Sequence, residues 1–172
     1  MTAFAPAGLD GFLSPRSVAI VGASPEPHGI RGALLRLLRK NGFAGAVYPV
    51  NPSHREIDGL QCYPDIAAIG APVDLAVVAV PAAAVPDVLE GCAAAGVAGA
   101  IVISSGFAED TTVRSDLQDR IAALARRTGM RVCGPNAEGF HNEVDCVTAT
   151  FSPAADRDAA AASPALRWAP PP

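Results

Sequence analysis

Five short apolar runs alternate with helical patterns, and this alternation restricts the fold more than any other feature of the chain. The runs hold few polar residues and are each followed by Gly, Asn, Pro or Ser, as is typical of strands buried on both faces. Such strands, joined by helices, form a parallel sheet with right-handed crossovers. The sequence therefore predicts an α/β fold, a Rossmann-like doubly wound sheet of about five strands. The runs are Ser17–Val21, Ala46–Val50, Val73–Val80, Ala100–Ile103 and Met130–Cys133.

Three of the segments between these runs carry apolar residues at helical spacing. The first begins at Ile30 and stops at Gly42, the second runs from Val85 to about Gly96, and the third from Val113 to Gly129. A shorter helix is expected over Pro64–Ile69. By analogy with dinucleotide-binding domains, we expect the strand order 3-2-1-4-5, counted in order of appearance.

Composition narrows the classes of function. The 172 residues are 50% hydrophobic and carry a net charge of −4, which argues against a nucleic-acid surface. No apolar run approaches the ~18 residues of a membrane span, and the N-terminus has no signal-peptide pattern. The four cysteines form no CxxC pair, so we expect no metal site and no disulfide. A cytoplasmic protein without nucleic-acid or membrane partners is the expectation.

The last part of the chain differs in composition. Residues 154–172 are rich in Ala and Pro and contain only Leu166 and Trp168 as large apolar groups. Such a segment buries too little to offset the cost of ordering it. We therefore expect one domain over residues 9–153, followed by a disordered tail that can be deleted after Pro153 with little effect on stability.

Ligands of open parallel sheets bind outside the carboxyl ends of the strands. In this chain those ends are rich in Gly, Pro, Ser and Asn, which let the backbone and hydroxyl groups approach a ligand closely. The first turn also leads into a helix N-terminus near Gly29, which favours phosphate. The strand ends are Gly22–Ser24, Val50–Pro52, Val80–Pro81, Ser104–Phe107 and Gly134–Asn136.

A dinucleotide enzyme is the obvious alternative, but two features count against it. The first turn reads GASPEPHG rather than GxGxxG, so the glycines that accommodate a pyrophosphate are missing. The second strand ends in Val50-Asn51-Pro52, where an NAD enzyme usually places an acidic residue for the ribose. An NAD(P)-linked oxidoreductase fragment is therefore less favoured.

Five motifs, in order along residues 9–153, resemble the CoA-binding domain of NDP-forming acyl-CoA synthetases. This family includes ADP-forming acetyl-CoA synthetase and is related to the succinyl-CoA synthetase α subunit. The resemblance implies coenzyme A or acyl-CoA as the ligand. The motifs are VAIVGAS (18–24), YPVNP (48–52), DLAVVAVPAAAVPDVLEGCAAAGV (74–97), ISSGFAE (103–109) and GPNAEG (134–139).

The same resemblance implies which residues meet the ligand. The first turn would contact a CoA phosphate, the ends of the second and third strands would border the adenosine, and the fourth would line the pantetheine path. The fifth motif would open a helix that faces a phosphohistidine. No residue of this chain is expected to be catalytic. The implied binding residues are Gly22, Ala23, Ser24, Asn51, Pro52, Val80, Pro81, Ser104, Ser105, Gly106, Pro135 and Asn136.

The chain departs from the family pattern in three ways. Ala137 and Glu138 follow Gly-Pro-Asn, where the family usually has a cysteine. The lysines common in the first loop and after Asn-Pro are absent, which leaves His28, His54 and Arg55 as cationic candidates for phosphate. The phosphohistidine and ATP-grasp domains of the family do not fit within 172 residues. We therefore expect the chain to need further synthetase domains or subunits and to be inactive alone.

Simpler interpretations remain open for these residues. Ser24 can be a turn cap, Asn51-Pro52 a strand stop, and His54 a solvated loop residue. At the level of function, a stand-alone CoA-binding protein with a regulatory or carrier role is the main alternative to a synthetase segment. A CoA-sensing domain fused to an acetyltransferase is a more distant one.

Overall fold

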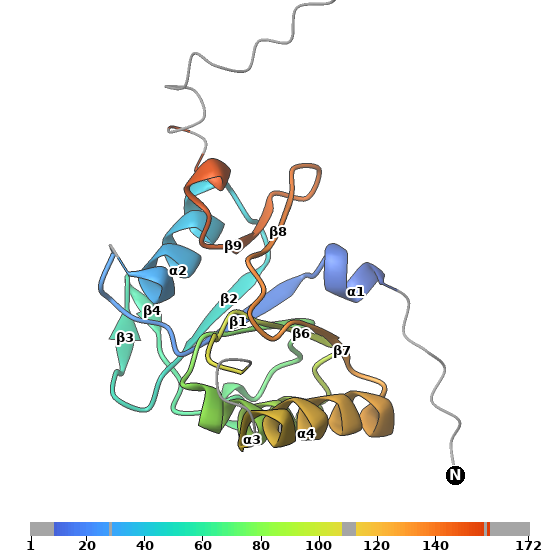
Figure 1. The fold of residues 1–172 in the computed structure, drawn as a ribbon. Coiled ribbons are helices and arrows are strands. Elements are labelled where there is room, and N and C mark those ends of the chain that lie inside the picture. The colour runs from blue at the N-terminus through green and yellow to red at the C-terminus, as the bar shows by residue number, and fades with distance from the viewer. Residues whose placement is uncertain (1–8, 28, 108–112, 157, 159–172) are drawn as a thin grey trace, which may run out of the picture.

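The structure, a computed structural model, describes residues 9–27, 29–107, 113–156 and 158, without the side chains of residues 113–115. His28 and Glu109 lie outside this description. The centre is a five-stranded parallel sheet, so the α/β class and the five strands expected from the sequence are confirmed (Figure 1). The strands are β1 (Ser17–Val21), β2 (Ala46–Val50), β5 (Leu75–Val78), β6 (Gly99–Val102) and β7 (Arg131–Cys133).

The expected strand order is wrong. The sheet runs β2-β1-β5-β6-β7, which is 2-1-3-4-5 in order of appearance. β5 pairs with β1 from Val18↔Leu75 to Val21↔Val78, on the side of β1 opposite β2. The apolar runs do not indicate which strands lie next to one another, and the expected order rests on analogy alone. The chain reverses direction across the sheet at β1, and the switch point therefore lies between β1 and β5.

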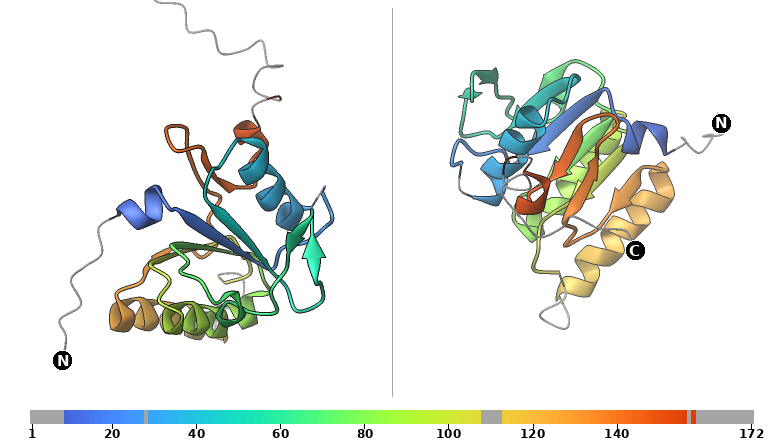
Figure 2. Two further views of the ribbon diagram at one scale, coloured as in Figure 1. Left: turned by 180° about the vertical axis from the view of Figure 1, so that it is seen from behind. Right: turned by 90° about the horizontal axis from the view of Figure 1, so that it is seen from above.

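Helices cover the sheet on both faces. α2 (Ile30–Lys40) lies on one face, while α3 (Val85–Ala94) and α4 (Val113–Thr128) lie side by side on the other (Figures 1 and 2). Right-handed crossovers require this arrangement, because the first connection leads away from β1 in one direction and the later ones in the opposite direction. Two buried apolar clusters result, one on each face of the sheet.

A hairpin completes the face that α2 covers. It comprises β8 (Gly139–Asn142) and β9 (Val147–Thr150), and Val147 and Ala149 of β9 are 0% and 2% exposed against α2 and the sheet. Phe140 of β8 stacks on Phe12 of α1 (Asp10–Leu13), with ring centroids 5.7 Å apart. The layer above the sheet is thus one helix and one hairpin rather than two helices.

This hairpin stands where the resemblance implied a helix after Gly134-Pro135-Asn136, and that expectation is wrong. Asn136 has a φ of +57° and Gly139 a φ of +91°, in the left-handed region that a right-handed helix does not use. The backbone N–H of Asn136 instead donates to the carbonyl of Ser104 at 3.1 Å. The chain therefore turns back along the sheet edge.

The connection between β2 and β5 contains no α-helix. It holds a small hairpin, β3 (Glu56–Ile57) and β4 (Leu60–Gln61), and a 3-10 turn, η1 (Ala67–Ile69), within the region expected to be helical. Further 3-10 turns are η2 (Ala82–Ala84) and η3 (Pro153–Ala155). No helix among the described residues is long and apolar enough to cross a membrane.

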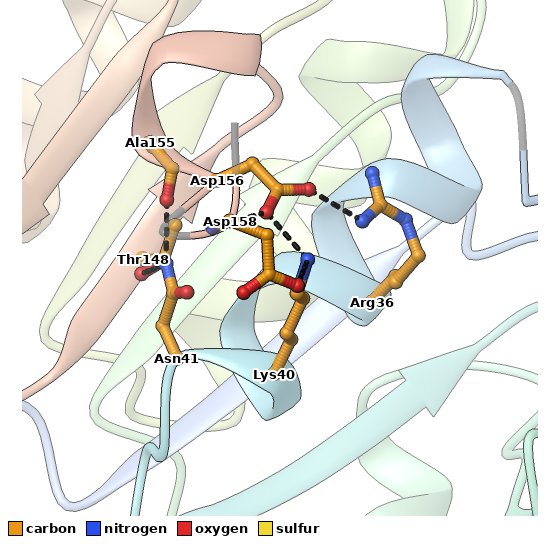
Figure 3. A network of polar contacts seen from close by, with 7 residues as sticks. All are labelled: Arg36, Lys40, Asn41, Thr148, Ala155, Asp156 and Asp158. Atoms are coloured by element: carbon orange, nitrogen blue, oxygen red, sulfur yellow. Dashed lines mark hydrogen bonds and ion pairs between the residues drawn. The ribbon is translucent and has the colours of Figure 1, made fainter. Parts of the chain in front are cut away.

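The segment after β9 is tied to the C-terminal end of α2 (Figure 3). The Asp156 carboxylate lies 3.0 Å from Nη1 of Arg36 and 2.5 Å from Nζ of Lys40, and Lys40 also lies 2.7 Å from the Asp158 carboxylate. The buried Asn41 amide donates to the carbonyl of the residue before Asp156 at 2.7 Å. Hydrogen bonds from Lys40 and then Arg36 hold the pKa of Asp156 well below its usual range.

These contacts bear on the domain boundary, which stays a prediction. Ion pairs of Asp156 and Asp158 with α2 favour a boundary after residue 158 rather than after Pro153. The rest of the expected tail, residues 159–172, lies outside the described residues.

Candidate functional site

Two clefts adjoin at the carboxyl edge of the sheet, beside the β1/β5 switch point. The first has a volume of about 480 Å³ and a largely apolar lining; the second has about 400 Å³ and more polar walls. Arg31, Val80 and Pro81 line both clefts, so the two spaces meet at these residues. The first is lined mainly by Val21, Val50, Pro52, Pro64, Ile66, Ala84, Val88 and Gly91, and the second by Ser24, Glu26, Gly29, Ile30, Ala79, Ile103, Ser104 and Ser105.

The first turn after β1 forms part of both clefts. Gly22 has a φ of +90°, and its N–H donates to the Val50 carbonyl at 2.8 Å. A Cβ at Gly22 would lie against the backbone of Ala79, including its carbonyl carbon at 2.9 Å. Glycine is therefore required here by the close approach of β1 to the end of β5, as well as by the backbone conformation. Ala23, also implied as a binding residue, is fully buried beneath this turn.

Ser24 has the turn-cap role weighed from the sequence, and its contact with a ligand stays a prediction. It lines the second cleft, and its Oγ accepts a hydrogen bond of 3.2 Å from the backbone N–H of Glu26. That bond is the local turn contact typical of a serine after a strand. The hydroxyl keeps its own proton to donate, so the turn contact and a ligand contact are compatible.

Asn51 fixes the geometry of the first cleft. Its Nδ2 donates to the Ala23 carbonyl at 2.8 Å, and its Oδ1 accepts from the Ser53 N–H at 2.9 Å. Its backbone N–H donates to the Tyr63 carbonyl at 2.8 Å. One side chain therefore ties the first turn to the end of β2, and Pro52 follows on the wall of the cleft.

Ser104 has the same function on the other side of the switch point. Its Oγ donates to the Val80 carbonyl at 2.6 Å, and only 8% of the residue is exposed. Ser105 is exposed on the wall of the second cleft, where its hydroxyl is available to a ligand. Gly106 and Asn136 lie beside this wall, outside the clefts, and the Asn136 N–H bonds to Ser104.

Other implied residues lie away from both clefts. His54 and Arg55 belong to the loop before β3, half-buried and exposed respectively. Pro135 is half-buried at the end of β7 and lines neither cleft. The strand-end residues are thus brought together, whereas the phosphate candidates taken from the loop after β2 are not part of the same cavity. Their binding roles remain predictions.

Sequence reasoning missed Arg31. It stands in the first turn of α2 and lines both clefts. The signal was available in the sequence, because a cation in the first turn opposes the helix dipole and requires a reason.

The chemistry of the clefts is that of binding. Their described lining contains Arg31, Glu26, Asp65 and Asp87 as charged residues, and no His, Cys or Lys. Cys62 lies close by, but burial raises the pKa of its thiol, which donates at 3.6 Å to the Asn51 carbonyl. No group of three metal-ligating side chains occurs among the described residues. The described walls can hold a ligand and orient it.

Comparison with known proteins identifies relatives along most of the chain. Over 144 residues it is 39% identical to the acetate–CoA ligase [ADP-forming] II of Archaeoglobus fulgidus, covering 84% of this chain and 21% of that protein. It is 38% identical to the acetate–CoA ligase [ADP-forming] I subunit alpha of Pyrococcus furiosus, covering 84% and 32% respectively. The chain spans about a fifth to a third of the length of these relatives.

A solved structure of a relative supports the same assignment. The acetyl-coenzyme A synthetase 1 of Ca. Korarchaeum cryptofilum, in complex with phosphate and ADP, superposes with a TM-score of 0.79 at 40% identity. The match covers 85% of this chain and 31% of that one. The resemblance inferred from the five motifs is therefore confirmed.

Residues 16–143 also match the family described as CoA binding domain. The matched range runs from the start of β1 through β8, so it includes the carboxyl edge and both clefts. The chain belongs to this family of CoA-binding domains.

Proposed function

We propose that this domain binds coenzyme A across the two clefts. The adenosine end would occupy the first cleft, the pantetheine arm would run through the second, and the diphosphate would lie where they meet. The observation that carries the proposal is the junction itself, where the Gly22 turn and the first turn of α2 border two adjoining cavities of different polarity.

The first cleft suits a flat aromatic base. Val21, Val50 and Val88 supply aliphatic walls, and Pro52 and Pro64 add rigid ring surfaces. Pockets for such groups are mostly apolar with a few polar groups that fix orientation. The second cleft presents hydroxyl groups along its walls, which suits the amide groups of pantetheine.

We further propose that the domain is the CoA-binding part of an ADP-forming acyl-CoA synthetase. Its relatives are named as ADP-forming ligases, and the chain spans only a fraction of their length. The phosphohistidine and ATP-grasp domains expected from the resemblance would act with it, as further domains or subunits. A cytoplasmic location fits such an enzyme.

Calorimetric titration of the purified chain with CoA, NAD⁺ and NADP⁺ tests the binding proposal. We expect saturable binding of CoA and none of the two nicotinamide cofactors. Binding of NAD⁺ or NADP⁺ in preference to CoA would contradict the proposal and favour the oxidoreductase alternative.

A matched pair of variants tests the placement of the adenosine. Ala84 lines the first cleft, whereas its neighbour Ala83 is exposed and lines neither cleft. We expect Ala84→Phe to fill the cleft and abolish binding of adenosine 3′,5′-bisphosphate, while Ala83→Phe leaves it intact. If the two variants bind adenosine 3′,5′-bisphosphate equally well, the adenosine binds outside the first cleft.

A further inference from the structure

Arg31 differs from the other cations of α2 in having no partner among the residues that the structure describes. Arg36 and Lys40 pair with Asp156, and Nη1 of Arg39 donates to the Asp58 carbonyl at 2.7 Å. No hydrogen bond or ion pair joins the Arg31 side chain to any residue in the described part of the chain. Arg31 is exposed and lines both clefts where they meet.

The position of Arg31 is unfavourable for helix stability. The first turn of a helix carries a partial positive charge, and cations are stabilising in the last turn, where α2 has Arg39 and Lys40. An unpaired arginine in the first turn is therefore not explained by the fold of α2. An anion that binds in the junction would make both the cation and the helix N-terminus favourable.

The loop before α2 is built to lie close to this turn. A Cβ at Gly32 would overlap the backbone carbonyl of Glu26, and the next backbone atom, Cα of Pro27, would be 3.1 Å away. Gly32 therefore lets the loop pack directly on the helix beside Arg31. The α2 N-cap, Gly29, makes no side-chain capping bond.

We infer that Arg31 binds the diphosphate of the ligand and so fixes the point where its two halves diverge. The inference rests on the proposed function and adds a residue to it. A planar guanidinium donates in pairs to phosphate oxygens, which suits a group with two adjacent phosphates. Because Arg31 borders both clefts, the group it reaches lies between the ligand's two ends. The 3′-phosphate on the ribose is at the adenosine end and is not the group inferred.

Calorimetry of three ligands tests the inference in the full chain. CoA and dephospho-CoA both carry the diphosphate, whereas pantetheine carries no phosphate. For Arg31→Ala we expect CoA and dephospho-CoA to lose affinity by the same factor, roughly 10- to 100-fold, as for a lost charge-assisted bond. Any binding of pantetheine should be unchanged. The CoA affinity of Arg31→Lys should lie between those of the wild type and Arg31→Ala, because lysine keeps the charge and loses the paired donors.

Arg126→Ala is the matched control, since Arg126 is an exposed helical arginine that lines neither cleft. It should bind all ligands as the wild type does, and both variants should keep the wild-type circular dichroism spectrum. Unchanged affinity of Arg31→Ala would overturn the inference, as would a loss for CoA alone, which indicates the 3′-phosphate. A wild-type chain that binds no CoA would instead overturn the proposed function.

Discussion

The side-chain amide of Asn51, at the end of β2, donates a hydrogen bond of 2.8 Å to the backbone carbonyl of Ala23, in the turn after β1. Two loops that come from neighbouring strands are thereby held at one separation. The first cleft lies between them, and the bond from the Gly22 N–H to the Val50 carbonyl joins the same two segments.

Replacement of Asn51 by Ala should therefore affect both stability and binding. Loss of the two side-chain hydrogen bonds of this half-buried residue should lower the free energy of unfolding by about 1–3 kcal/mol. CoA affinity should fall because the cleft loses its preorganised width. Denaturant unfolding and calorimetry measure the two effects. Asn51→Asp keeps the acceptor for Ser53 and loses the donor to Ala23; an affinity like that of the wild type would show that the donor is irrelevant.

A Cβ at Gly22 should destabilise the domain through two separable costs. A positive φ at a non-glycine residue costs about 1–2 kcal/mol, and the contact with the Ala79 backbone adds to it. Gly42→Ala is the control, because Gly42 has a φ of +86° and no heavy atom within 4 Å of the added Cβ. We expect Gly22→Ala to lose clearly more unfolding free energy than Gly42→Ala. Equal losses would mean that the close approach to β5 costs nothing.

Asp156 should make the stability of the domain sensitive to acid. Because its folded-state pKa is lowered by Lys40 and Arg36, its contribution is present above the unfolded value of about 3.9 and is lost as the pH falls through the folded value. Asp156→Asn lacks this contribution at neutral pH. Its unfolding free energy should consequently fall less steeply below a pH of about 4 than that of the wild type. Parallel acid profiles would exclude Asp156 as a source of the dependence.

Truncation of the chain also tests the ion pairs of Asp156. A chain that ends after Asp158 keeps the ion pairs with Arg36 and Lys40, and a chain that ends after Pro153 loses them. The shorter chain should have the lower thermal midpoint. Identical midpoints would instead support the boundary at Pro153 expected from composition.

The cysteine thiols should differ widely in reactivity. Burial raises the pKa of the Cys92 thiol to about 12 and also raises the pKa of Cys62, whereas Cys133 is exposed. Since the thiolate is the reactive form, a disulfide reagent at a pH of about 8 should modify Cys133 first and Cys92 last. Cys133→Ser should remove the fast phase. Fast modification of Cys92 in the folded domain would contradict this order.

Some of the fold could be predicted because its signals are local. Ser17–Val21 and Ala46–Val50 form strands at the expected bounds, since a short apolar run followed by Gly or Asn is typical of a strand in a parallel sheet. The strand order could not be predicted in the same way. An apolar residue such as Val77 in β5 or Ile101 in β6 does not indicate which strand lies next to its own. The pairing of β5 with β1 is determined by tertiary packing.

The position of the candidate site could be predicted from the sequence, but the contacts of its residues could not. Gly22, Asn51 and Ser104 were placed correctly at one edge because the carboxyl ends of parallel strands meet there. Their individual roles were not visible, since Asn51 and Ser104 bind backbone carbonyls that are distant in sequence. Arg31 was missed because helical spacing shows which face of a helix is apolar. It does not show that a cleft adjoins the first turn of the helix.

Arg31 and Lys40 stand near opposite ends of one helix. An α-helix of eleven residues is a nearly rigid rod about 16 Å long, so its two ends move together. A displacement of the first turn along the helix axis would therefore reach the ion pairs of Asp156 and Asp158 near the other end.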